Sequence, residues 1–167
     1  GAGLSVGDLH FSQGDGEITF CGAIEMAGWV HMKVSLIKGG MAKDGVKENA
    51  VFLPGNRDPQ YSEWIAFSGV SVDSSGKQHY LDSGLAYANA CNHAIDYLMK
   101  FGYTDIQAYM ILGTAPVEGR LSGVVDIPNA CSTIYIPRAI FDFDIRPSAK
   151  GAPHQVKQGL QVPRSAN

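Results

Sequence analysis

The side chains of this chain that can do chemistry are concentrated near its amino end. Positions 7–17 read GDLHFSQGDGE, with three acidic side chains, one imidazole and one carboxamide within eleven residues. Asp8 and His10 stand two apart, so in an extended segment they point to the same side, as two ligands of one metal ion would. With Asp15 they form a carboxylate–imidazole–carboxylate set that suits zinc or another divalent ion with an open position for water.

The glycines of this run, Gly14 and Gly16, allow the backbone to turn tightly or to approach a bound group closely. A simpler interpretation is a glycine-rich turn in which Asp and Gln side chains cap their own backbone. A turn by itself needs no histidine, so the sequence favours the chemical interpretation.

Three further residues are candidates for reactive groups. Glu25 follows an apolar run, and apolar neighbours would raise its pKa toward the range useful for proton transfer at neutral pH. Equally, it could be a solvent-facing residue at the end of a strand. Cys21 and Cys131 are candidate nucleophiles, although a free cysteine is more often a small buried hydrophobe.

A second group of polar residues lies in turns bounded by glycine and proline, at 116–120 and 125–131. These turns could line one pocket with Asp8 and His10, and Asn129 offers an amide for substrate recognition. They could equally be ordinary connections of a sheet. The sequence leaves the two interpretations balanced.

The composition limits the classes of protein to which the chain can belong. The chain has 167 residues, 45% apolar and 17% charged, which is enough for one globular domain with a core. A net charge of −3 and a pI near 5.9 argue against nucleic acid and against an anionic membrane surface as partners. No apolar run is long enough to span a bilayer, and no secretory leader is visible. Three widely separated cysteines fit a reducing compartment, with the cytoplasm as the default.

Periodicity predicts strands before and after a helical segment. Residues 29–37 alternate, with Val30, Met32, Val34 and Leu36 on one face, as in a half-buried strand. Other segments with strand character are 17–24, 51–53, 61–72 with a bend at Gly69, 119–127 and 131–136.

Two helices are predicted between these strands. The first covers about 81–101, with Asp82 or Ser83 as its cap, and the second covers about 104–113 and begins at Thr104. The fold class is therefore α+β and mainly β: an antiparallel β-sandwich-like domain with two accessory helices. We expect a single domain over 1–147 and a polar tail over 148–167.

The runs at 7–17, 21–25, 109–119 and 125–129 resemble the acetamidase/formamidase family, and its formamidase branch in particular. The resemblance covers nearly the whole chain but only the carboxy-terminal portion of a longer family protein. The abrupt start at Gly1, without methionine, agrees with this. The resemblance implies a cytoplasmic hydrolase that splits short aliphatic amides such as formamide into a carboxylate and ammonia. It also implies a β-rich sandwich, homo-oligomers, a folded unit shared with the missing amino-terminal segment, and a divalent metal, zinc first.

By the same resemblance, Asp8, His10 and Asp15 would hold the metal and form the core of the site. Gln13 would bind substrate with Asn129, and Glu17 would support the core. Glu25, Asp15 and His10 would be the catalytic residues, with Glu25 moving protons. This set suits amide hydrolysis, which needs an activated water, an electrophile for the developing oxyanion and an acid for the leaving ammonia.

Two other classes of function remain open on the sequence alone. One is an amidase in which Cys21 or Cys131 forms an acyl-enzyme. The other is a non-catalytic sandwich module whose acidic turn binds calcium through oxygen ligands. A histidine among the candidate ligands counts against calcium.

Overall fold

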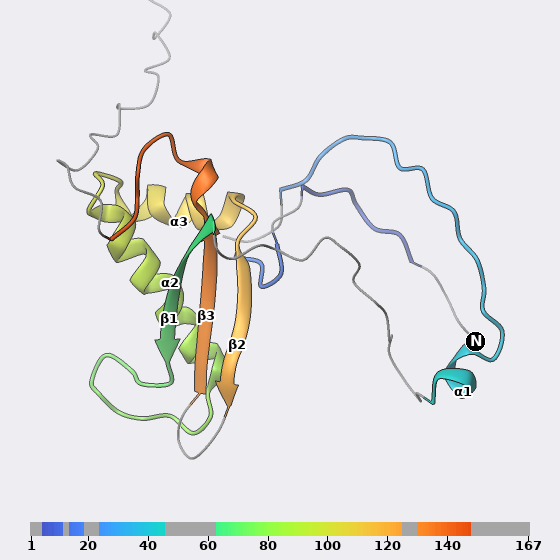
Figure 1. Cartoon of the computed structure of the whole chain (residues 1–167), viewed down its shortest axis with the longest axis horizontal. Coiled ribbons are helices and arrows are strands. Elements are labelled where there is room, and N and C mark those ends of the chain that lie inside the picture. The colour runs from blue at the N-terminus through green and yellow to red at the C-terminus, as the bar shows by residue number, and fades with distance from the viewer. Residues whose placement is uncertain (1–4, 12–13, 19–23, 46–62, 125–129, 148–167) are drawn as a thin grey trace, which may run out of the picture.

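The computed structural model describes five stretches of the chain: 5–11, 14–18, 24–45, 63–124 and 130–147. Their elements are, in order, α1 (Gly40–Asp44), β1 (Trp64–Val70), α2 (Ser83–Met99), α3 (Asp105–Thr114), β2 (Glu118–Val124), β3 (Ala130–Pro137) and the short 3-10 helix η2 (Arg138–Ile140). Figure 1 shows two regions. We call the described residues of 63–147, with the turn 14–18, the body. Residues 5–11 and 24–45 extend away from it, and we call them the arm.

The body is built on a three-stranded antiparallel sheet in the order β1-β3-β2. The central strand β3, ACSTIYIP, has few polar residues and lies between two partners, so most of its side chains are buried. Ile134 marks the shared register, because it pairs with Phe67 of β1 and with Gly119 of β2. The sheet therefore brings strands that are far apart in sequence together on one side of helix α2.

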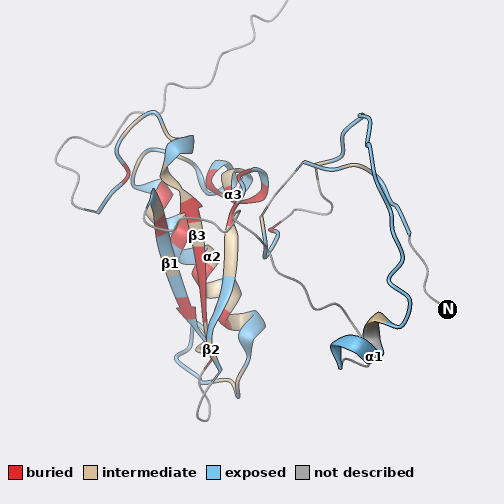
Figure 2. Cartoon of the chain, turned by 45° about the vertical axis from the view of Figure 1, so that its right-hand side comes forward, coloured by how far each residue is buried: buried red, intermediate tan, exposed pale blue. Residues whose placement is uncertain are grey.

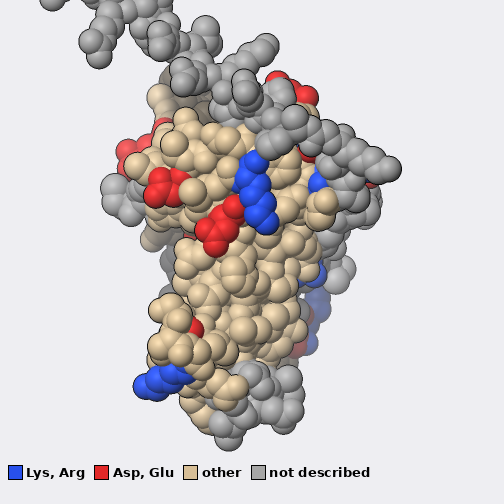
Figure 3. Space-filling model, turned by 90° about the vertical axis from the view of Figure 1, so that its left-hand side faces the viewer, with Lys and Arg blue, Asp and Glu red and all other residues tan. Residues whose placement is uncertain are grey.

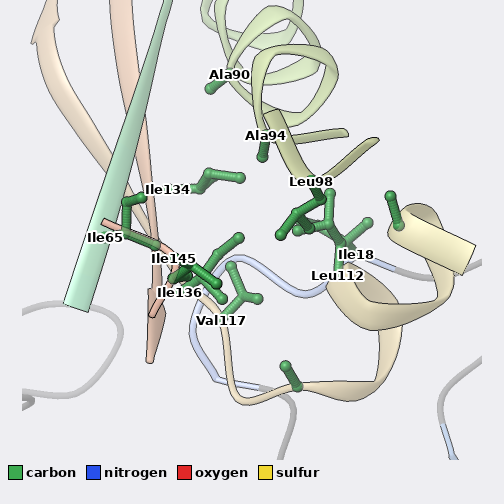
Figure 4. Packing of buried hydrophobic residues seen from close by; sticks show 12 residues of the cluster. Ile18, Ile65, Ala90, Ala94, Leu98, Leu112, Val117, Ile134, Ile136 and Ile145 are labelled. Carbon is green, nitrogen blue, oxygen red and sulfur yellow. The ribbon is translucent and has the colours of Figure 1, made fainter. Parts of the chain in front are cut away.

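Helix α2 covers one face of this sheet. Its fully buried residues Ala86, Ala90, Ala94 and Leu98 recur every four positions, so they form one stripe along the helix. Figure 4 shows part of this stripe facing isoleucines of the strands. Small alanines let the helix approach the sheet closely, and at Gly69 a Cβ would collide with the α2 backbone at Ala86 and Ala90. Gly69, where the sequence predicts a bend in the strand, is thus the position at which α2 passes close to β1.

Both predicted helices are confirmed, with their caps. The side chain of Asp82 accepts a hydrogen bond from the backbone N–H of Leu85 at 2.9 Å. At the second helix, the Thr104 side chain accepts from the Gln107 N–H, and the Gln107 side chain accepts in return from the Thr104 N–H, which is a capping box. These local hydrogen bonds are readable from sequence because each one links residues three positions apart.

The last residue of the turn 14–18 packs into the core formed by the rest of the body. Ile18 belongs to the main core with Leu112 of α3, Val117 and Ile145 (Figure 4). One apolar side chain therefore fastens the acidic turn to the hydrophobic core. The neighbouring residues 19–23, in the strand expected over 17–24, lie outside the described residues, as do 51–53 and the tail 148–167.

The prediction of a half-buried strand over 29–37 is wrong. The segment has no regular secondary structure, and Val30, Met32, Val34 and Leu36 are all exposed. Figure 2 shows the arm almost entirely exposed beside a body with a buried centre. The physical reason is the lack of a partner: within the described ranges, no strand lies beside this segment to form a sheet with it.

An antiparallel sheet with helices is confirmed, whereas a sandwich is not. The described residues contain one sheet, and its face away from α2 carries a row of hydroxyls. Thr133 Oγ1 lies 2.9 Å from Ser68 Oγ and accepts a hydrogen bond from Ser122 Oγ at 2.6 Å. A hydroxyl row offers less apolar area to a second sheet than the α2-facing side does. Among the helices described, none is both long enough and apolar enough to cross a membrane.

Candidate active site

The arm brings two of the predicted catalytic residues face to face. His10 and Glu25 form an isolated antiparallel bridge, flanked by hydrogen bonds from Phe11 N to Ile24 O at 3.0 Å and from Met26 N to Leu9 O at 2.9 Å. In this pattern the two central residues are a non-hydrogen-bonded pair, whose side chains leave the same face close together. Both side chains are exposed.

The acidic turn 14–18 is held against β2 and α2 through its backbone carbonyls. The N–H of Gly119 donates to the Asp15 carbonyl, and the Tyr87 hydroxyl donates to the Gly16 carbonyl. Gly14 and Gly16 have φ values of +76° and +86°, and a Cβ on Gly16 would lie 2.8 Å from both Gly119 Cα and Tyr87 Oη. The glycines are therefore required where the turn meets β2 and α2, so the group they approach closely is the protein itself.

Two carboxylates meet at this junction. Glu118, the first residue of β2, accepts a hydrogen bond from the backbone N–H of Asp15. Burial raises the pKa of the Glu118 carboxyl, and the nearby Asp15 carboxylate raises it further, while the hydrogen bond acts in the opposite direction. Asp15 and Glu17 themselves are exposed. Glu118 thus acts as a cap on the turn, and the Asp15 carboxylate is open to solvent.

A pocket of about 560 Å³ lies beside the turn. Its lining comes from the turn, from one face of α2 and from α3: Glu17, Ile18, Tyr87, Ala88, Cys91, Asn92, Ile95 and Tyr109. Burial raises the pKa of the Cys91 thiol to about 11, so at neutral pH it is a protonated, weakly nucleophilic group. Burial, with Cys91 nearby, raises the pKa of Tyr87 to about 12, which keeps its hydroxyl a donor.

The structure divides the predicted site residues between the two regions. Asp8, His10 and Glu25 lie on the arm, and Asp15 lies on the turn. Gln13, Asn129 and Cys21 lie outside the described residues, and Cys131 is a half-buried residue of β3. Within the described stretches, no three His, Cys, Asp or Glu side chains come close enough to hold a metal ion. Asp8, His10 and Asp15 are therefore not brought together as such a group within these stretches.

The sequence drew attention to the segment 116–120 that contacts the acidic turn, but not to the residues of α2 that lie beside the turn. The sequence leaves open whether the segment 116–120 lines a pocket with Asp8 and His10 or is an ordinary sheet connection. In the structure, its residues Glu118 and Gly119 contact the acidic turn. Tyr87 and Cys91 were not singled out. Their spacing of four on α2 puts them on one helix face, but nothing in the sequence says that the turn covers this face.

Two arginines of the described body form short ion pairs. Arg138 binds Glu63 and Arg146 binds Asp144, each at 2.7 Å. The Arg146 guanidinium lowers the pKa of the Asp144 carboxyl to about 2. On the face shown in Figure 3, basic and acidic side chains are scattered over a mostly uncharged surface.

Comparison with known proteins places the chain in one protein family. The sequence profile of the Acetamidase/Formamidase family matches residues 1–143. The chain is 62% identical over 160 residues to a formamidase of Methylophilus methylotrophus, covering 96% of this chain and 39% of that protein. It is 61% identical over 120 residues to an acetamidase of Mycolicibacterium smegmatis, covering 71% of this chain and 30% of that one.

A solved structure has the same fold. The gamma lactamase from Delftia acidovorans matches with a TM-score of 0.81 and 67% sequence identity, over 93% of this chain and 38% of that chain. The chain therefore spans well under half the length of these relatives, and it corresponds to their carboxy-terminal part.

Proposed function

Because the chain belongs to the acetamidase/formamidase family, we propose that it takes part in hydrolysing short aliphatic amides, formamide first, to a carboxylate and ammonia. The identity to a formamidase and to an acetamidase supports an amidase reaction on linear amides. The chain covers 39% and 30% of those two proteins, so the complete activity is part of the proposal.

The observation that carries this proposal is the opposed pair of His10 and Glu25. In amide hydrolysis, a water oxygen attacks the carbonyl carbon, the C–N bond breaks, and a proton from the water reaches the departing nitrogen. A carboxylate and an imidazole that face each other can share these proton transfers: one group removes a proton from the water, and the other delivers a proton to the departing nitrogen. We assign these roles to Glu25 and His10, and assign Asp15 the support of the same centre from the turn.

A divalent metal is a separate proposal. We propose zinc first, with Asp8, His10 and Asp15 as the ligands that the family resemblance suggests. Because these three do not form such a group among the described residues, we derive no step through a metal. Metal analysis of the purified protein decides the point: a stoichiometric divalent ion, reduced by Asp8→Ala, supports the proposal, and an unchanged metal content in that variant contradicts the ligand assignment.

We do not assign the pocket beside the turn to formamide. Formamide has three non-hydrogen atoms, whereas a pocket of about 560 Å³ is in the range that takes drug-sized ligands. Selection for a very small amide needs a tight site that excludes larger acyl groups. We propose Gln13 and Asn129 as the residues that bind the substrate; both lie outside the described residues.

Ammonia release from formamide and acetamide tests the activity. It is measured for the chain alone and for the chain joined to the amino-terminal part of the Methylophilus formamidase. We expect release from at least one form, with His10→Ala lowering kcat/KM by about 100-fold or more. His31→Ala is the matched control, because His31 is also an exposed histidine of the arm but is away from the bridge. No ammonia from either form, or equal losses in both variants, contradicts the proposal.

We further propose a cytoplasmic location and assembly into homo-oligomers. Cys91 and Cys131 are free thiols, which supports a reducing compartment. Light scattering of the purified chain and cell fractionation test these two points separately from the activity.

A further inference from the structure

The pocket beside the acidic turn is not assigned to the proposed reaction. Its volume is about 560 Å³, and its walls come from the turn 14–18, from α2 and from α3. Cavities of this size bury most of the surface of a small organic molecule. Because its walls come from parts of the chain that are distant in sequence, the cavity exists only in the folded body, where it presents a fixed set of side chains.

Most of the lining suits an apolar group. Ile18 and Ile95 contribute aliphatic side chains, and burial raises the pKa of the Cys91 thiol to about 11, so this thiol is uncharged at neutral pH. The side chain of Tyr87 is fixed in place, because its hydroxyl donates a hydrogen bond to the Gly16 carbonyl. The pocket therefore offers apolar contacts that are already in position before a ligand arrives.

The charge of the lining has one sign. Glu17 is the one acidic or basic residue that the described part of the chain contributes to it. Tyr87 and Tyr109 also line the pocket, and aromatic rings attract organic cations through their electron-rich faces. An anionic ligand would meet the Glu17 carboxylate with no basic side chain among the described lining residues to offset it. The lining therefore favours a ligand with one positive charge on an apolar body.

We propose that this pocket binds a small organic ammonium cation with an aryl or alkyl body. The ammonium group lies near the Glu17 carboxylate and the tyrosine rings, and the apolar body packs against Ile18, Cys91 and Ile95. Such a ligand contacts the turn and α2 together, so it holds the turn in place. The inference is independent of the proposed activity, because binding is measured without any amide substrate.

Titration with three probes of similar size tests the inference. They are phenethylammonium, phenethyl alcohol, in which a hydroxyl replaces the ammonium group, and hydrocinnamate, which carries a carboxylate instead. Amide chemical shifts of the isotope-labelled chain report where each probe binds. We expect shifts in residues 14–18 and 87–95, a Kd about tenfold or more lower for phenethylammonium than for phenethyl alcohol, and no binding of hydrocinnamate.

Two substitutions of exposed carboxylates provide a matched control. Glu17→Gln removes the charge of the pocket and keeps the size of the side chain. Asp96→Asn removes a charge from α2, at an exposed position that is not among the described lining residues. We expect Glu17→Gln to raise the Kd of phenethylammonium by about fivefold and Asp96→Asn to raise it by less than about twofold.

A third substitution fills the cavity. Ala88 lines the pocket and is exposed, so Ala88→Phe places a ring in the cavity without entering the core. We expect this variant to lose phenethylammonium binding while its midpoint of urea unfolding stays the same. Binding that survives in this variant would overturn the inference.

Other results would also overturn it. They are equal Kd values for phenethylammonium and phenethyl alcohol, equal effects of the two carboxylate substitutions, or chemical shift changes confined to other parts of the chain. The titration is repeated on the chain joined to the amino-terminal part of the Methylophilus formamidase, where we expect binding to be retained. Loss of binding in that joined protein would assign the pocket to a contact with the added part and would overturn the inference.

Discussion

The body and the arm each contain a segment with a strong strand pattern, and only one of them is in a sheet. In the body, β3 lies between β1 and β2, and Ile134 and Ile136 are completely buried. In the arm, Val34 and Leu36 have the same apolar character at the same spacing and remain exposed. Alternation therefore indicates which face of a segment is suited to burial. Whether that face is covered depends on which other polypeptide is present.

The largest effect is expected where the body is packed most closely. Gly69→Val introduces side-chain atoms where even a Cβ would collide with the α2 backbone, so helix and sheet must separate. We expect the free energy of unfolding to fall by more than about 3 kcal/mol, measured by urea denaturation.

Gly123→Val is the control for this change, because Gly123 is also in a strand and has no heavy atom within 4 Å of its ideal Cβ. We expect it to change stability by less than about 0.5 kcal/mol. If both variants lost a similar free energy of unfolding, the close approach of α2 to β1 would not be the reason that position 69 requires glycine.

A pair of identical substitutions compares the two regions directly. Leu98→Ala removes a side chain that is completely buried in the body, and Leu36→Ala removes one that is 72% exposed on the arm. We expect the first to cost about 3 kcal/mol of unfolding free energy and the second less than about 0.5 kcal/mol. Thermal or urea unfolding of the chain alone measures both. Comparable losses would mean that the arm packs on the body in solution.

The smallest effect concerns the loop that leads from β1 into α2. A hydrogen bond from His79, at 2.7 Å, and others from Ser75 lower the pKa of the Asp73 carboxyl below its ordinary value. A lowered pKa contributes stability above the unfolded-state value of about 3.9, and this contribution is lost as the pH falls below it. We expect Asp73→Asn to be less stable than the native chain at pH 6, with the difference shrinking toward pH 3.

Urea unfolding at several pH values measures this dependence. Ser74→Ala, in the same loop, is the control, because Ser75 and not Ser74 hydrogen-bonds to Asp73. A difference for Asp73→Asn that stays constant from pH 6 to pH 3 would contradict the role given to the carboxylate.

The elements that sequence predicted well are those fixed by nearby residues. Asp82 and Thr104 cap helices through residues three positions ahead, so both helix starts were readable. The strands of the sheet were also found, with ends shifted by a few residues. The strand at 29–37 was predicted wrongly because its pattern describes a buried face, and the described chain supplies nothing to bury it against.

The candidate site was only partly predictable for the same reason. Spacing identified His10 and Glu25 as chemical groups, and the pairing that makes them neighbours joins residues fifteen positions apart. The anchoring of Gly16 by Tyr87 joins positions 71 residues apart and depends on how the turn meets α2. Contacts of this kind follow from tertiary packing, which a local pattern does not contain.

The central claim is that His10 and Glu25 act together on a small amide, and a double-mutant cycle tests it most directly. Ammonia release from formamide is measured for His10→Ala, for Glu25→Gln and for the double variant, in whichever form of the protein is active. If the two groups serve one proton-transfer step, each single change lowers kcat/KM by about 100-fold and the double variant is little worse than either. Losses that multiply in the double variant, or a single variant with full activity, would contradict the account.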